Sequence, residues 1–173
     1  FVWHELAFGL ENLALPTKVI RRRVAEMAAF FGMETWFRKK TSELSGGQKQ
    51  MLNLASVMAM NPKLLILDEP TSMLDPLAAR SLLDTVERIN RELGVAVLLT
   101  EHRLDAVFPV CDRVLVMDHG TLRIDAPPAQ IAARLTREQE QERLYYGMPA
   151  PVRICGELGA DPIPLSVRQA RGY

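Results

Sequence analysis

The chain has 173 residues, of which 48% are hydrophobic and 24% charged, so one globular domain with a short appendage is expected. Its 21 basic and 21 acidic residues cancel, and only 6% of the residues are aromatic. Without a basic surplus or a stacking surface, the composition argues against a nucleic-acid partner. Two isolated cysteines are too few for a disulfide framework, and no apolar run reaches the ~18 residues of a membrane-spanning helix.

Residues 1–62 are predicted to be mainly helical. Apolar residues recur at helical spacing from Val2 to Leu13. Pro16 suits the first turn of a second helix through Phe31, and Gly32 suits its C-terminal cap. A third helix is expected to end at Met60, before a proline.

Ser45-Gly46-Gly47 comes directly before this third helix, which is expected to begin at Gln48. The two glycines remove side chains where an anion could approach the backbone, and the first-turn N–H groups face that space. Ser45 can cap the helix and also donate its hydroxyl to a phosphate oxygen. Taken alone, the motif is also compatible with an ordinary loop and cap.

The pattern changes after residue 62 to strand, helix, strand. Leu64–Leu67 and Val95–Leu99 are apolar runs typical of strands buried on both faces, and the helix between them begins at Asp75-Pro76. These lengths predict a parallel βαβ unit. The first strand delivers Asp68 and Glu69 at its carboxyl end, and the second leads to His102. Side chains at this edge of an open α/β sheet are placed to bind a ligand.

The sequence signals for the remaining elements are weaker. A short helix from Leu104 to Val110 is expected, followed by a hairpin of Arg113–Met117 and Leu122–Ile124 and a helix from Pro127 to Arg134. The stretch from Arg137 to Arg143 has a charged helical pattern. Residues 135–173 as a whole are interpreted as a tail or linker with little independent core.

Four motifs in this order resemble the ATP-binding-cassette (ABC) ATPases. Leu44 to Gln48 resembles the signature motif, Leu64 to Glu69 resembles Walker B, Ser72 to Asp75 resembles the D-loop, and His102 matches the switch histidine. Met73 stands where the family usually has alanine or glycine. The resemblance covers residues 1 to about 134.

The resemblance implies an α/β fold of the P-loop NTPase type with ATP and Mg²⁺ as cofactors. It divides the chain into a helical subdomain (1–62), the second part of the ATPase core (63–134) and the tail (135–173). Asp68 becomes the metal ligand, and Glu69 and His102 become the catalytic residues. Ser45, Gly46, Gly47, Gln48 and Asp75 would contact nucleotide across a sandwich dimer with a second ATPase subunit or domain.

Two further segments resemble the ATPase components of energy-coupling-factor transporters, which import vitamins and transition-metal ions. These are Ala7 to Asn12 and Glu101 to Leu104. The resemblance implies a transmembrane coupling subunit as partner and a peripheral location on the cytoplasmic face of the cell membrane.

The sequence contains no Gly-x-x-x-x-Gly-Lys-Ser/Thr motif and begins without methionine. We therefore expect a C-terminal portion that is inactive alone and whose uncovered strands favour self-association. Two other interpretations stay open: a soluble, non-transport ABC ATPase, and a non-enzymatic module that lends its signature motif to a partner ATPase.

Overall fold

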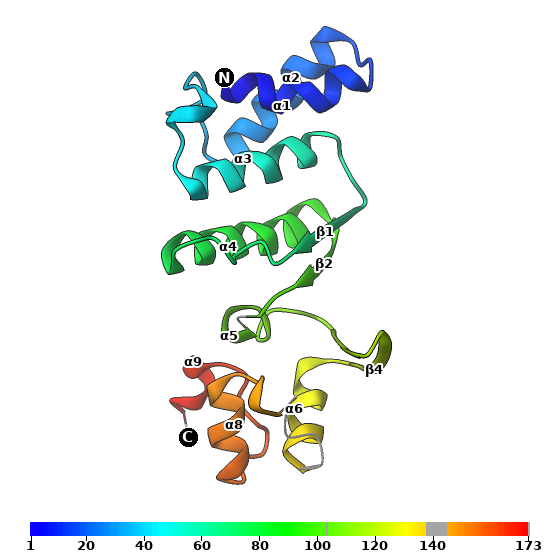
Figure 1. Cartoon of the computed structure of the whole chain (residues 1–173), viewed down its shortest axis with the longest axis vertical. Coiled ribbons are helices and arrows are strands. Elements are labelled where there is room, and N and C mark those ends of the chain that lie inside the picture. Colours follow the sequence, from blue (N-terminus) through cyan, green and yellow to red (C-terminus); the bar gives the residue numbers. More distant parts are fainter. Residues whose placement is uncertain (103, 138–144, 173) are drawn as a thin grey trace. The chain divides into compact units, whose positions relative to one another are not determined.

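The computed structural model describes residues 1–102, 104–137 and 145–172, which form two compact units, Phe1–Thr100 and Glu101–Tyr173 (Figure 1). The elements of the first unit are α1 (Val2–Asn12), α2 (Thr17–Phe30), a 3₁₀ turn η1 (Thr41–Glu43), α3 (Gly46–Ala59), β1 (Leu64–Asp68), α4 (Pro76–Leu93) and β2 (Ala96–Thr100). Those of the second are α5 (Leu104–Val107), β3 (Val114–Asp118), β4 (Thr121–Ala126), α6 (Pro128–Arg137), α8 (Ala150–Glu157) and α9 (Val167–Ala170).

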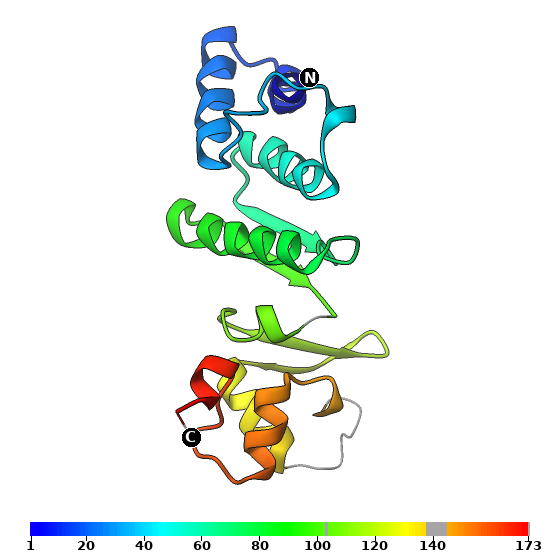
Figure 2. The same cartoon turned by 90° about the vertical axis from the view of Figure 1, so that its left-hand side faces the viewer.

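The predicted βαβ unit is present in the first unit. β1 and β2 pair in parallel, with Leu64 opposite Ala96 and Asp68 opposite Thr100. Helix α4 runs alongside the two strands in both views (Figure 1 and Figure 2). It starts at Pro76 and ends at Leu93, and it is capped by Gly94, whose left-handed φ of +66° suits glycine. Start and end both match the sequence prediction.

The core of the first unit joins α1, α2 and α3 to one face of this small sheet. Leu6 and Leu10 of α1 are almost fully buried, and Leu65 of β1 and Leu82 of α4 belong to the same core. Burying such side chains is the main favourable term in folding, so truncating one to alanine costs about 2–5 kcal/mol. The helices around the signature-like segment are therefore held by the same core that fixes β1.

The strands are buried on one face rather than on both, and among the described residues of this unit their other face is uncovered, as the expectation of self-association requires. Leu64, Ile66 and Leu98 are 52%, 65% and 44% exposed, whereas Leu65 on the other face is 4% exposed. The helices of the first unit cover one face of the sheet, and no described residue of this unit buries the opposite one. An apolar run shows that a strand suits a buried setting, but what covers it depends on tertiary packing.

The second unit contains the predicted hairpin, with β3 and β4 antiparallel. Its core brings Phe108, Ile124 and Ile131 together with Met148 and Val152 from beyond residue 144. The expectation for residues 135–173 therefore needs correction, because the described part of this segment shares a hydrophobic core with the hairpin and α6. Of the charged stretch from Arg137 to Arg143, residues 138–143 lie outside the described residues.

Several element limits differ from the prediction by a few residues. Helix α5 ends at Val107 rather than Val110, and α3 begins at Gly46 rather than Gln48. The predicted domain boundaries at 62 and 134 stay predictions, since the first compact unit includes both the helical part and the βαβ unit. Among the described helices, none is long and apolar enough to cross a membrane.

Candidate functional site

The N-terminus of α3 carries the signature-like residues. The Ser45 N–H donates to Gln48 Oε1 at 3.0 Å, and the Gln48 N–H donates to Ser45 Oγ at 3.2 Å. This reciprocal pair is a capping box, and it explains why the helix begins at Gly46. The N–H groups of Gly46 and Gly47 have no acceptor within the helix, and the helix dipole places partial positive charge there.

The two glycines are not equivalent. A Cβ added at Gly46 would meet no atom within 4 Å, so there is open space beside this backbone. A Cβ at Gly47 would lie 3.1 Å from the Ala78 Cβ. Gly46 thus leaves room for an approaching anion, whereas Gly47 allows the first turn of α3 to pack against the first turn of α4.

Asp75 lies at the start of that neighbouring helix. Its Oδ1 accepts hydrogen bonds from the N–H groups of Leu77 and Ala78, both at 3.0 Å. This confirms Asp75 as the N-cap of α4. Because Ala78 also adjoins Gly47, the structure brings the signature-like segment and the D-loop-like segment together at two adjacent helix starts.

Asp68 and Glu69 follow from β1 and are both exposed. Thr100, at the end of β2, donates its hydroxyl to Asp68 Oδ1 at 2.5 Å. The Glu69 N–H donates to the Thr100 hydroxyl oxygen and carbonyl oxygen, each at 3.1 Å. Glu69 has a left-handed backbone with φ of +43°, a conformation that costs a non-glycine residue on the order of 1 kcal/mol.

Thr100 was not identified as a functional residue from the sequence. A signal was available, since it is a polar residue at the end of an apolar strand predicted to pair with the strand that carries Asp68. His102 belongs to the second unit, so its approach to Asp68 and Glu69 stays a prediction.

The exposed carboxylate at the end of β1 would fit a magnesium ion whose other ligands come from water and phosphate groups. In the part of the chain that the structure describes, no group of three or more His, Cys, Asp or Glu side chains gathers to hold a metal. Proteins usually hold Mg²⁺ with one or two carboxylates, completed by water and substrate phosphates. Asp68, exposed at the end of β1 with Oδ1 fixed by Thr100, fits such a single-carboxylate role.

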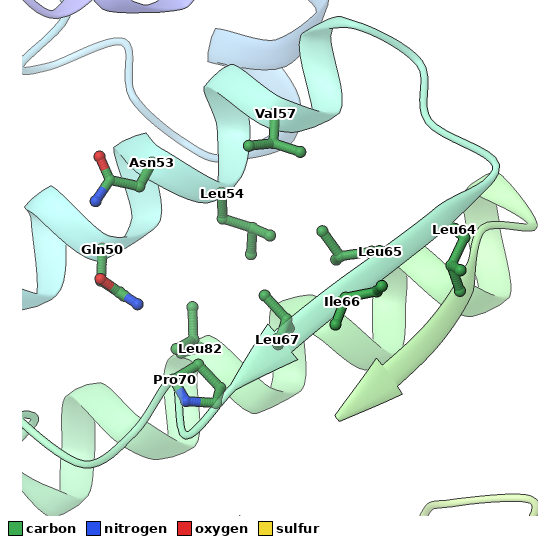
Figure 3. Close-up of a pocket in the computed structure, with 10 residues that line it drawn as sticks. All are labelled: Gln50, Asn53, Leu54, Val57, Leu64, Leu65, Ile66, Leu67, Pro70 and Leu82. Atoms are coloured by element: carbon green, nitrogen blue, oxygen red, sulfur yellow. The ribbon is translucent and has the colours of Figure 1, made fainter. Parts of the chain in front are cut away.

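A hollow of about 210 Å³ lies between α3, β1 and α4, and neither Asp68 nor Glu69 lines it (Figure 3). Its lining is apolar except for Gln50 and Asn53 on α3, and no charged side chain contributes to it. Figure 3 shows Leu54 and Val57 of α3 on the same helix as the two amides, across from Leu65 of β1. An apolar wall without charge suits packing against protein rather than binding a polyphosphate.

Comparison with known proteins finds relatives among transporter ATP-binding proteins. A family model described as ABC transporter matches residues 5–72. A putative ABC transporter ATP-binding protein of Bacillus anthracis is 44% identical over 98% of this chain and 30% of its own length. The energy-coupling factor transporter ATP-binding protein EcfA1 of Symbiobacterium thermophilum is 40% identical over 95% of this chain and 56% of its own length.

A solved structure supports the same fold. The structure of cbiO1 from Clostridium perfringens, described as part of the ABC transporter complex cbiONQ, superposes with a TM-score of 0.71 at 34% identity. The match covers 84% of this chain and 59% of cbiO1. The chain therefore spans less than two thirds of the length of each of these three proteins, two of which are named as transporter ATP-binding proteins.

Proposed function

Because the chain belongs to the family of ABC transporter ATP-binding domains, we propose that it is part of an ATPase subunit that couples ATP hydrolysis to solute import. The observation that carries the proposal is the presence, in one compact unit, of a capped helix start with open space at Gly46 and a strand end with two exposed carboxylates. The first feature suits a phosphate, and the second suits a magnesium ion and an attacking water.

Each residue has a role in this proposal. Asp68 would hold the Mg²⁺ ion, which supplies charge stabilisation at the phosphoryl group when it is bound. Glu69 would orient the attacking water and accept its proton, and His102 would contact the γ-phosphate or that water. Ser45 to Gln48 would contact ATP held by a second ATPase subunit or domain, with Asp75 close to the same interface.

We assign the chain to the energy-coupling-factor type of importer, as its similarity to EcfA1 and cbiO1 supports. The helical residues 1–62 would then engage a transmembrane coupling subunit, and the chain would lie peripherally on the cytoplasmic face of the membrane. The solute would be a vitamin or a transition-metal ion, chosen by other subunits.

Because the chain spans less than two thirds of the length of these relatives, we infer that it belongs to a longer, full-length gene product with a P-loop. Glu69→Gln in that product tests the role of the carboxylate. Loss of a general base costs about 10²–10⁴-fold in turnover, so we expect a drop of this size with little change in ATP binding. Phosphate release and nucleotide binding are measured side by side. Wild-type turnover by the Glu69→Gln variant would contradict the assignment.

The 173-residue chain alone is expected to release no phosphate, because its sequence supplies no P-loop to hold the β- and γ-phosphates. Robust turnover by purified chain that disappears in Glu69→Gln would contradict this expectation.

The second candidate function, a module that lends its signature motif, is favoured by the complete capping box on α3. In that case the wild-type chain and Glu69→Gln would stimulate a P-loop-containing partner equally.

A further inference from the structure

Thr100 contacts both candidate residues at the end of β1. Its hydroxyl lies 2.5 Å from Asp68 Oδ1, and its hydroxyl and carbonyl oxygens each lie 3.1 Å from the Glu69 nitrogen. These bonds join positions 31 or 32 residues apart in the sequence. They exist because β1 and β2 pair in a register that sets Asp68 opposite Thr100.

The chemistry of the hydroxyl explains why one residue can serve both neighbours. A hydroxyl has a single proton to donate and lone pairs with which to accept. Here the proton goes to the Asp68 carboxylate, which can only accept when ionised, and a lone pair receives the Glu69 N–H. Valine has nearly the same shape but can do neither, whereas serine can do both.

The contacts of Thr100 constrain one side chain, that of Asp68, and one stretch of backbone, that of Glu69. The bond to Oδ1 fixes the orientation of the Asp68 carboxylate and leaves Oδ2 for another ligand. The bonds to the Glu69 nitrogen hold a backbone whose φ of +43° is unfavourable for a side chain with a Cβ. The Glu69 carbonyl also accepts from the Ser72 N–H at 3.1 Å, so the turn is held from both sides.

We propose that Thr100 is a positioning residue that fixes the Asp68 carboxylate and the Glu69 backbone together, so that metal ligand and general base keep one mutual geometry. This inference rests on the proposed function, which assigns those two roles. Groups that orient a ligand from behind typically contribute 10–100-fold to metal affinity or activity.

The experiment compares Thr100→Val with Thr100→Ser in the full-length gene product. We expect Thr100→Val to lower kcat about 10–100-fold and to raise the Mg²⁺ concentration needed for half-maximal turnover, with KM for ATP little changed. Thr100→Ser should restore both values to within about threefold, because it keeps the donor and the acceptor. Thr85→Val is the matched control, since among the described residues the Thr85 hydroxyl bonds only to the Ser81 carbonyl on α4, at 2.8 Å.

A second measurement uses the 173-residue chain and does not depend on activity. Amide hydrogen exchange by NMR should show faster exchange of the Glu69 N–H in Thr100→Val than in wild type or Thr100→Ser, at unchanged melting temperature. Thr100→Ala replaces Thr100→Val if the latter does not fold. A purely structural role for Thr100 would instead lower the melting temperature and leave the Mg²⁺ dependence unchanged.

The outcomes separate the two proposals. If Asp68→Asn and Glu69→Gln abolish turnover while Thr100→Val keeps wild-type kcat and Mg²⁺ dependence, the positioning role is wrong and the proposed function stands. If Asp68→Asn and Glu69→Gln both keep full turnover, the proposed function fails, and with it the positioning role.

Discussion

At the scale of single residues, several candidate functional groups also hold the backbone in place. Ser45 caps α3, Asp75 caps α4, and Asp68 accepts the Thr100 hydroxyl. A residue with such a double role is costly to replace for two reasons, so loss of activity and loss of stability must be measured separately. Glu69 differs, because its left-handed backbone opposes stability.

Replacing Glu69 by glycine and by alanine separates the backbone cost from the carboxylate. Alanine keeps the Cβ that disfavours φ of +43°, whereas glycine does not, so Glu69→Gly should be more stable than Glu69→Ala by about 0.5–1 kcal/mol. At Met73, which is 93% exposed and has no positive φ, the glycine variant should be the less stable. Urea unfolding of the four variants tests this. If Glu69→Gly is less stable than Glu69→Ala by as much as glycine is less stable than alanine at position 73, the site carries no backbone strain.

At the scale of elements, the packing of α3 against α4 depends on a missing side chain. The first turns of the two helices meet where a Cβ at Gly47 would be 3.1 Å from the Ala78 Cβ, while the neighbouring Gly46 faces open space. The paired glycines of the signature-like motif therefore have different physical reasons to be glycine.

This difference predicts opposite effects of the same substitution. Gly47→Ala should destabilise the chain by about 1 kcal/mol, because a crowded contact forces the helix starts apart. Gly46→Ala should be neutral or slightly stabilising, since alanine is the better helix former. Thermal unfolding of the two variants provides the comparison, with each serving as the other's control. A more stable Gly47→Ala would show that α4 shifts without cost.

At the scale of the whole molecule, each compact unit has its own core. In the first unit, one face of the β1–β2 sheet presents Leu64, Ile66 and Leu98 to solvent. Exposed apolar strands promote association between chains. We therefore expect the 173-residue chain to self-associate through this face.

Lysine substitutions on the two faces of β1 test the expectation. Ile66→Lys, at a position 65% exposed, should reduce the mass measured by light scattering at high concentration and leave the melting temperature nearly unchanged. Leu65→Lys is the contrasting variant, because it buries a charge at a position 4% exposed and should unfold the first unit. A wild-type chain that stays monomeric at all concentrations would refute the idea.

Sequence patterns predicted the elements in which short-range signals agree. Helical spacing located α1, Asp75-Pro76 and Gly94 marked the two ends of α4, and two apolar runs around that helix predicted the parallel pair. The same patterns placed Asp68 and Glu69 at a strand end and Ser45 at a helix cap. These features depend on residues within about one helical turn or one strand of each other, so a single sequence contains them.

Only the tertiary structure showed which side of the sheet is covered, that residues beyond 144 share a core with the hairpin, and that Thr100 joins Asp68 to Glu69. Each of these depends on contacts between residues far apart in the chain. The sequence by itself determined where a metal ligand and an anion-binding helix start could be. Strand register and helix packing then decided which residues hold Asp68, Glu69 and the start of α3 in place. The contacts between these residues arise only when the separate elements are brought together.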